Sequence, residues 1–280
     1  MVTQNFKFET FKALHFQDRA FVMPNPWDAG STRLLAALGF AALATTSAGY
    51  AFSVGKRDSF AGLSQSEILA NAQAIVEATD LPVSADLEDG FGAAPETCAD
   101  TVIKAWGVGL VGGSIEDATG DPDQPIYEMA QSVERVEAAV EAARGQSFFL
   151  TARAENFLWD RPDLNDTIRR LQAFEAAGAD VLYAPGLPDI EAIKTVCDEV
   201  GKPVNVVMGL SGPTYSVQEL SDAGVRRISV GGSFARAAFG ALKRAAQEVM
   251  EGGTFTYASE AMPGAELAGL MDQQKPVRRC

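Results

Sequence analysis

Short apolar, β-rich runs alternate with longer amphipathic stretches along most of the chain. The runs are typical of strands, and the stretches repeat apolar positions with the period of a helix that packs on one face. Eight runs stand out, and we expect strands at 21–27, 41–47, 82–88, 112–117, 148–154, 181–186, 203–209 and 226–233. The alternation predicts repeated strand and helix units.

The helical stretches begin with polar residues and have glycine near their ends. The segment "EAAGAD" at 175–180 has counterparts in "LAALGF" at 35–40 and "LSDAGV" at 220–225, each a helix end with a glycine stop. Eight such units predict the α/β class and, within it, a (β/α)8 TIM barrel. An open doubly wound sheet would use fewer strands and usually carries a glycine fingerprint after the first strand, where this chain has "PNPWDAGS".

The chain length favours one large domain with a terminal extension. Its 280 residues, 47% of them hydrophobic, can bury a large core. No linker-like or low-complexity segment divides them. We therefore expect the catalytic barrel at 1–245 and a C-terminal helical extension with a tail at 246–280.

The charge balance disfavours several kinds of partner. The chain has 23 basic and 37 acidic residues, a formal net charge of -14, which argues against nucleic acid or an anionic membrane. No window has the apolar length to cross a bilayer, and the first residues lack the features of a signal or transit peptide. Cys98, Cys197 and Cys280 show no disulfide or metal-binding spacing. We expect a cytoplasmic protein.

The chain has a single histidine, His15, inside an N-terminal helical pattern. One histidine makes histidine-based nucleophile triads and multi-histidine zinc sites improbable. We expect His15 to be structural, so acid and base chemistry falls to carboxylates, lysine, tyrosine, hydroxyls or a metal-bound water.

Acidic residues gather at the ends of the expected strands. Asp86 and Glu88 alternate at the end of strand 82–88, so they would share one face, and Glu116 and Arg153 end the next two strands. Because barrel enzymes build their sites at these ends, we expect these four side chains to meet. Hard oxygen ligands without histidine or cysteine favour Mg²⁺ or Mn²⁺. Three other acids lie near strand ends: Asp28, Asp89 and Asp117. For these, a structural role as helix caps or as partners of Arg153 is as good an explanation as a role in the site.

A divalent cation, several acids and one arginine suit a 2-oxo acid. The acid chelates the metal through carboxylate and carbonyl oxygens, and arginine binds another carboxylate through charge-assisted hydrogen bonds. The metal stabilises an enolate while the adjacent carbon bond breaks, which is lyase chemistry, and backbone amides near Ser47 and Gly49 are candidate oxyanion donors. Schiff-base aldolase chemistry is disfavoured because none of the eight expected strands contains a lysine.

Four segments resemble the isocitrate lyase and phosphoenolpyruvate mutase superfamily. The family has an acidic strand end of the form D-x-D-x-G-[FY]-G, which "DLEDGFG" at 86–92 matches with glutamate as the second acid. The likeness continues in "TTSAGYAFSVGKRDS" (45–59), "SIEDATG" (114–120) and "TARAENF" (151–157), and it spans most of residues 20 to 245. The branch that this chain most resembles contains 2-methylisocitrate lyases and oxaloacetate decarboxylases.

The resemblance implies roles for particular residues. The metal would be held by Asp86, directly or through water, with Glu88 and Glu116. Asp58 would lie near substrate and metal as a catalytic residue, together with Glu116 and Arg153, and Arg153 would bind a substrate carboxylate or phosphonate. The remaining substrate-binding residues would be Ser47, Ala48, Gly49 and Asn205.

One departure from the family narrows the chemistry. Isocitrate and 2-methylisocitrate lyases carry a gating loop with a catalytic cysteine after the fourth strand, whereas residues 116–128 here contain no cysteine, histidine or lysine. We therefore expect a Mg²⁺-dependent carbon–carbon lyase or decarboxylase acting on a small 2-oxo acid or 2-oxo dicarboxylate through an enolate. Two alternatives stay open: phosphonopyruvate-type mutase or hydrolase chemistry, and binding of a 2-oxo acid without turnover.

The resemblance also bears on assembly. The segment after Gly240 extends past the eighth helix and is mildly apolar. The superfamily commonly exchanges its last helices between subunits, so we expect a homodimer or homotetramer with an exchanged C-terminal extension. The sequence does not identify the substrate.

Overall fold

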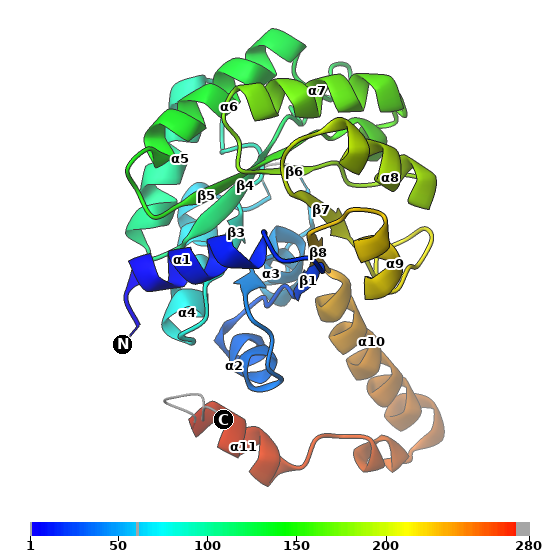
Figure 1. The fold of residues 1–280 in the computed structure, drawn as a ribbon. Coiled ribbons are helices and arrows are strands. Elements are labelled where there is room, and N and C mark those ends of the chain that lie inside the picture. Colours follow the sequence, from blue (N-terminus) through cyan, green and yellow to red (C-terminus); the bar gives the residue numbers. More distant parts are fainter. Residues whose placement is uncertain (1, 60–61, 273–280) are drawn as a thin grey trace.

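The structure is a computed structural model that describes residues 2–59 and 62–272. Within them, eight parallel strands alternate with helices and curve into a nearly closed barrel (Figure 1), which confirms the predicted α/β fold. The strands are β1 (Phe21–Met23), β2 (Leu43–Ala44), β3 (Val83–Asp86), β4 (Gly112–Glu116), β5 (Phe149–Arg153), β6 (Val181–Tyr183), β7 (Val204–Val207) and β8 (Arg227–Ser229).

The strands are ordered β1-β8-β7-β6-β5-β4-β3-β2, and each neighbouring pair in that order shares a parallel ladder. Between β1 and β2 the described residues form no ladder, and the amide of Ala44 donates to the carbonyl of Pro24 at 3.1 Å. The Asn25 side chain completes this seam. It donates to the Thr45 carbonyl at 2.8 Å and accepts from the amides of Val230 and Gly231, both at 2.9 Å.

The helices cover the outside of the barrel. Asp28 and Ser64 form capping boxes at the starts of α2 (Ala29–Ala37) and α4 (Gln65–Glu77), so the capping explanation is confirmed for Asp28. Gly178 and Gly224 follow α7 (Leu164–Ala176) and α9 (Val217–Asp222) with φ of 103° and 96°, as expected for glycine stops. The helices are α1 (Gln4–Leu14), α2 (Ala29–Ala37), α3 (Ser47–Ser53), α4 (Gln65–Glu77), α5 (Pro95–Gly107), α6 (Met129–Ala143), α7 (Leu164–Ala176), α8 (Ile190–Glu199), α9 (Val217–Asp222), α10 (Ser233–Gln247), α11 (Gly264–Asp272) and three short ones, η1 (Asn156–Trp159), η2 (Glu248–Gly252) and η3 (Thr256–Ser259).

The strands are shorter than the sequence predicted, because the chain leaves the ladder as soon as it reaches the site. The clearest case is β3, which ends at Asp86 rather than at 88. Glu88 has φ of 48°, a left-handed conformation that no strand contains. The prediction that Asp86 and Glu88 alternate along one strand is therefore wrong, and Glu88 belongs to a turn.

Helix α1 closes the N-terminal end of the barrel. Phe11 is fully buried and packs edge to face against Phe21 of β1 and Phe149 of β5. His15 lies in the same cluster and is 1% exposed, so its predicted structural role is confirmed. Because this end is filled, a ligand can enter the barrel only from the opposite end, where the strands finish.

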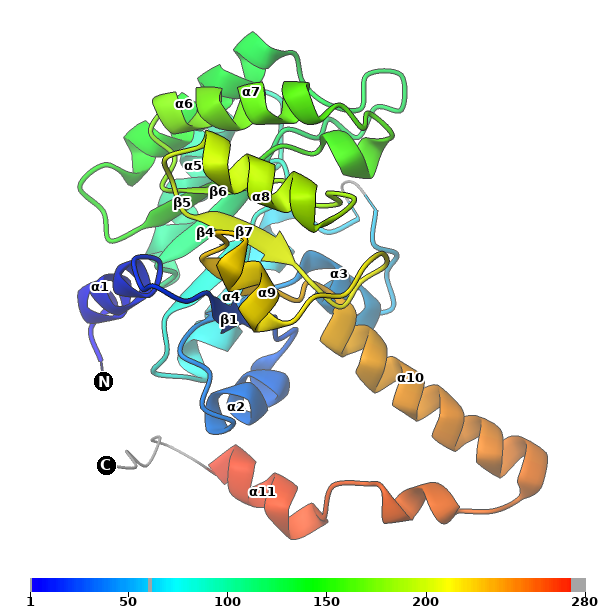
Figure 2. The same ribbon diagram turned by 45° about the vertical axis from the view of Figure 1, so that its right-hand side comes forward.

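The C-terminal segment leaves the barrel. Helix α10 projects outward and the chain returns through η2 and η3 to α11, which lies beside α2 of the same chain (Figure 2). Exposed apolar side chains follow this segment, among them Leu242 (64%), Met250 (84%) and Phe255 (64%). The predicted domain boundary at 245 falls inside α10, and the tail at 273–280 lies outside the described residues. In the described part of the chain, no helix has both the length and the apolar character to span a bilayer.

Candidate active site

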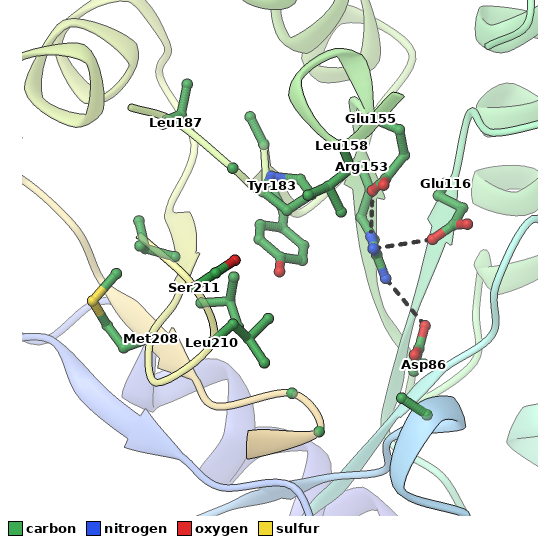
Figure 3. Close-up of a pocket in the computed structure, with 18 of the residues that line it drawn as sticks. Asp86, Glu116, Arg153, Glu155, Leu158, Tyr183, Leu187, Met208, Leu210 and Ser211 are labelled. Carbon is green, nitrogen blue, oxygen red and sulfur yellow. Dashed lines mark hydrogen bonds and ion pairs between the residues drawn. The ribbon is translucent and has the colours of Figure 1, made fainter. Parts of the chain in front are cut away.

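A cavity of about 520 Å³ opens at the C-terminal ends of the strands (Figure 3). Residues at the ends of β3, β4 and β5, together with residues that follow β2, β3 and β5, line one side of it with hydroxyls and charged groups, and residues after β5, β6 and β7 line the other side. Of the predicted site residues, the structure brings seven to this cavity: Ser47, Ala48, Asp58, Asp86, Glu88, Glu116 and Arg153.

Arg153 is the centre of the polar side. Its side chain is 13% exposed and forms ion pairs with Asp86 (Nη1 to Oδ1, 3.1 Å), Glu116 (Nη2 to Oε2, 3.1 Å) and Glu155 (Nε to Oε1, 2.8 Å). The strand register explains this, since Glu116 of β4 and Tyr183 of β6 stand opposite Arg153 on either side of β5. The guanidinium also lies 5.0 Å from the centre of the Tyr183 ring, a cation–π contact.

The acids on this side of the cavity outnumber the single cation, and the pKa values of Glu88 and Glu116 are raised. Burial, followed by the charges of Asp86, Asp89 and Asp58, raises the pKa of Glu88 to about 8. Burial also raises the pKa of Glu116, although Arg153 opposes the shift. Burial alone would lower the pKa of Arg153, but its carboxylate neighbours raise it. Burial and mutual repulsion therefore disfavour the charged forms of Glu88 and Glu116, and a further positive charge in the cavity would relieve this.

Asp58 stands at the mouth of the cavity on the loop after α3 and is exposed. Desolvation by its surroundings, followed by the negative charge of Asp86, raises the pKa of this carboxyl, and Arg153 opposes the shift. Asp58 therefore lines the same cavity as the predicted metal and substrate residues, and its catalytic role stays a prediction.

The turn that begins α3 faces Asp86. The hydroxyl of Ser47 donates to Asp86 Oδ2 at 2.8 Å, and the Ser47 amide lies 3.4 Å from the same oxygen. Gly49 does not line the cavity. It is buried, and its amide donates to Oγ1 of Thr46, the N-cap of α3, at 3.2 Å. The prediction of Gly49 as a substrate ligand or oxyanion donor is therefore not supported, because the helix cap already uses that amide.

A buried turn holds Glu88 in position. Asp89 accepts from the amide of Phe91 at 2.8 Å, and Arg135 of α6 donates to the carbonyls of Asp89 and Gly92. Arg135 is 1% exposed. Asp89 thus builds the turn instead of binding a ligand. Arg135 could not be predicted from local sequence, because it lies 46 residues from Asp89.

A second buried arginine fixes the ends of β4 and β5. Arg170 Nη1 donates to Asp117 Oδ2 at 2.9 Å and to the Tyr127 carbonyl at 2.8 Å. The other Asp117 oxygen accepts from the Glu155 amide at 2.8 Å. Asp117 therefore aligns the segment that carries Arg153 and Glu155, and it neither caps a helix nor pairs with Arg153.

Asn205 is placed differently from the prediction. It is 1% exposed inside the barrel, where it donates to Ser229 Oγ at 3.1 Å and accepts from Arg227 Nε at 2.8 Å. It lines a small cavity of about 70 Å³ rather than the main one. The reason is its register: Asn205 pairs with Tyr183 of β6 and Arg227 of β8, within the ladder and before the strand end.

The loop after β4 folds on itself. Ala118 and Ile126 form an antiparallel bridge, and the amide of Thr119 donates to the Pro125 carbonyl at 3.0 Å. Of the segment 117–128, no residue is among those that line the cavity in the described part of the chain. The segment that lacks cysteine, histidine and lysine therefore also adds no other side chain to the cavity.

The carboxylates do not form a ready-made cage for a metal. Among residues 2–59 and 62–272, no three His, Cys, Asp or Glu side chains are arranged to hold one ion directly. Asp86, Glu88 and Glu116 nevertheless line the same cavity, and their all-oxygen donors carry more charge than Arg153 offsets. Such a set fits a Mg²⁺ or Mn²⁺ ion held partly through waters.

The other side of the cavity is apolar, which the sequence did not indicate. Six residues form it, and we call them the apolar wall: Leu158, Trp159, Leu187, Met208, Leu210 and Tyr215. Figure 3 shows Leu187, Met208 and Leu210 on one side of Tyr183 and Asp86 and Glu116 on the other. Four of them lie in loops, and Leu158 and Trp159 lie in the four-residue helix η1; such short or irregular segments give no signal in hydrophobic periodicity.

The chain is similar to a known protein family and to solved structures. Residues 11–250 match the family model described as phosphoenolpyruvate phosphomutase. A crystal structure from Burkholderia cenocepacia J2315, assigned only to the lyase/mutase class, is 54% identical with a TM-score of 0.95 and covers 97% of this chain and 98% of its own. The crystal structure of a 2,3-dimethylmalate lyase is 27% identical with a TM-score of 0.85 and covers 97% and 95%.

The chain is also similar in sequence to curated relatives. A Mycobacterium tuberculosis protein of uncharacterised function is 31% identical over 95% of this chain and 97% of its own length. The 2-methylisocitrate lyase of Escherichia coli is 28% identical over 65% of this chain and 62% of its own. The oxaloacetate decarboxylase of Pseudomonas savastanoi is 26% identical over 78% and 75%.

Proposed function

The chain is an enzyme of the phosphoenolpyruvate phosphomutase family, within the isocitrate lyase superfamily, and from this premise we propose that it is a Mg²⁺- or Mn²⁺-dependent carbon–carbon lyase or decarboxylase. Its substrate is a small 2-oxo acid or 2-oxo dicarboxylate. The observation that carries the proposal is the ion-pair cluster of Arg153 with Asp86 and Glu116, beside Ser47, at the open end of the barrel.

The residues divide the work by their chemistry. Asp86, Glu88 and Glu116 would hold the cation, which when bound polarises the 2-oxo group and stabilises negative charge on its oxygen. Arg153 binds a substrate carboxylate through guanidinium hydrogens not used in its ion pairs, and Ser47 orients Asp86 through the 2.8 Å hydrogen bond.

Decarboxylation of a 2-oxo dicarboxylate illustrates the step. The bond between C3 and the distal carboxylate breaks, carbon dioxide leaves, and the electron pair moves into the 2-oxo group to give an enolate. A proton then adds to C3, which yields the shorter 2-oxo acid. Asp58, which lines the same cavity as Asp86 and Arg153, is the candidate to supply that proton.

The test uses purified protein with Mg²⁺ or Mn²⁺ against oxaloacetate, 2-methylisocitrate, 2,3-dimethylmalate and phosphonopyruvate. We expect carbon–carbon cleavage of oxaloacetate above the metal-only rate, and a large loss in Asp86→Ala. Cleavage of only 2-methylisocitrate or 2,3-dimethylmalate, which are hydroxy acids, would keep the lyase and overturn the 2-oxo acid as substrate. Carbon–phosphorus cleavage of phosphonopyruvate would replace this proposal with mutase or hydrolase chemistry, and no turnover of any compound would remove it.

A second candidate is binding of a 2-oxo acid without turnover. The loop 117–128 favours it, since among the described residues that loop adds no side chain to the cavity. Asp86→Ala separates the two: an enzyme loses its rate, whereas a binding protein has no rate to lose and shows weaker ligand affinity alone.

We also propose that the protein is a homodimer or homotetramer. The support is the exposed apolar series on α10 and the segment after it, including Leu242, Met250 and Phe255, which an aqueous surface disfavours. Equilibrium sedimentation should give a mass of two or four chains, and the mass of one chain would overturn the proposal.

A further inference from the structure

We propose that the apolar wall is a binding subsite, so that the substrate carries a branched-chain or aromatic substituent on the part of the molecule remote from its 2-oxo acid group. This inference rests on the proposed function, because the polar side of the cavity must hold the 2-oxo acid end. It adds that the preferred substrate is larger and more apolar than an unsubstituted four-carbon diacid.

The polar and apolar sides of the cavity come from different parts of the barrel. The ends of β3 and β4 and the residues that follow β2 and β3 contribute hydroxyls and carboxylates. The apolar wall comes from three neighbouring connections, with Leu158 and Trp159 on η1 after β5, Leu187 after β6, and Met208 after β7. Because β5, β6 and β7 are adjacent in the barrel, these three connections are neighbours at the cavity.

Two leucines of the wall are exposed in the free protein. Leu158 is 54% and Leu210 is 43% exposed, and both face the cavity (Figure 3). Large apolar side chains gathered on the wall of a cavity, with a polar cluster opposite, are typical of a ligand site. Burying them under an apolar substituent would release ordered water and strengthen binding.

The wall approaches the polar end of the cavity at Gly231 and Gly232. A side chain added at Gly231 would meet the Leu210 methyl groups at 3.7 and 4.0 Å, so Leu210 packs over Gly231. A side chain added at the next residue, Gly232, would meet Ala48 at 3.3 Å. Leu210 thus lies close to the Ser47–Ala48 turn, and one small molecule can contact both.

The charges of the cavity exclude larger polyanions. Among the lining residues that the structure describes, Arg153 is the sole cation, and three carboxylates already pair with it. A phosphonyl group or an additional carboxylate placed at the apolar wall would lose water without gaining a charged partner, which is costly. An uncharged, apolar substituent suits that end.

The test compares ligands that share a polar end and differ in their substituent. Oxamate has the carboxylate and carbonyl of a 2-oxo acid, and N-isopropyloxamate and N-benzyloxamate add apolar groups to its amide. We would measure their affinities by calorimetry in the presence of Mn²⁺. We expect N-benzyloxamate to bind about tenfold or more tighter than oxamate, as burial of such a group predicts.

The outcomes separate the two proposals. If oxamate binds and the substituted oxamates bind no better, the apolar subsite is refuted while the proposed function stands. If no oxamate binds with Mn²⁺ present, the proposed function fails and the subsite fails with it. Tighter binding of the substituted ligands supports both.

Variants of the apolar wall test whether its side chains cause the tighter binding of N-benzyloxamate. In Leu210→Asn and Leu158→Asn the ratio of N-benzyloxamate to oxamate affinity should fall toward one. Leu38, 67% exposed at the end of α2 and absent from the cavity lining, is the matched control, and Leu38→Asn should keep the ratio of the parent. An unchanged ratio in both wall variants would refute the assignment.

Discussion

Replacing His15 with glutamine should weaken the loss of stability that the protein suffers in acid. His15 is 1% exposed, and its Nδ1 lies 2.8 Å from the Phe11 carbonyl, which it can contact only as a donor. That leaves Nε2 without a proton and able to accept from Arg227 Nη1 at 3.3 Å. Burial first, and then the charge of Arg227, lowers the pKa of His15 to about 3.

The magnitude follows from the two states of the chain. In the unfolded chain, a histidine has a pKa of about 6.5, so it gains a proton as the pH falls while the folded protein does not. The contribution is fully present above pH 6.5 and is lost progressively from there toward pH 3. Between pH 7 and pH 5, His15 alone should remove about 2 kcal/mol from the free energy of unfolding.

Urea unfolding of the parent and His15→Gln at pH 7 and pH 5 measures this. Buried acids such as Glu88 and Glu116 have raised pKa values and act in the opposite direction, but they cancel in the comparison of the two proteins. His15 is also the only histidine in the chain, so its NMR signals report its proton directly. Equal pH dependence in both proteins, or a His15 titration near pH 6.5, would refute the reasoning.

Three further changes test the supports of the site. Arg170→Met leaves Asp117 buried without its cation and should lower the free energy of unfolding in urea by about 3–5 kcal/mol. Adding Asp117→Asn should recover part of that loss. A loss below about 1 kcal/mol would contradict the pairing. Gly90→Ala places a methyl group 2.8 Å from Cys98 Sγ at φ of 80° and should cost about 1–3 kcal/mol, so an unchanged melting temperature would count against it. Mn²⁺ uptake at pH 7 should release a proton because the Glu88 pKa is about 8; calorimetry in buffers of different ionisation enthalpy measures it, and release that persists in Glu88→Gln would show another source.

The sequence predicted the barrel and the meeting of Asp86, Glu116 and Arg153 because both depend on regular structure. Strand periodicity identifies the ends of parallel strands, and the ladder then brings Glu116 opposite Arg153. The same logic failed for Glu88, since a left-handed turn interrupts the alternation, and for Asn205, since its position within the ladder depends on register.

Other parts of the site had no local signal. The amide of Gly49 is used by the cap of its own helix, a detail of hydrogen bonding that the residue type does not specify. Arg135 and Arg170 act on carbonyls and carboxylates that lie 43 to 53 residues away in the sequence. The apolar wall is assembled from three loops whose conformations depend on the finished barrel.

The seam between β1 and β2 makes the barrel mechanically uneven. Seven interfaces resist separation with registered ladders, while in the described residues this one depends on the Ala44 amide and the Asn25 side chain. Thermal fluctuations that open the cylinder should therefore begin along a single line. That line ends at Thr46 and Ser47, at the floor of the cavity. A ligand that binds Thr46 and Ser47 would therefore add contacts at the end of the β1–β2 seam. Ligand binding should then make the whole barrel more rigid.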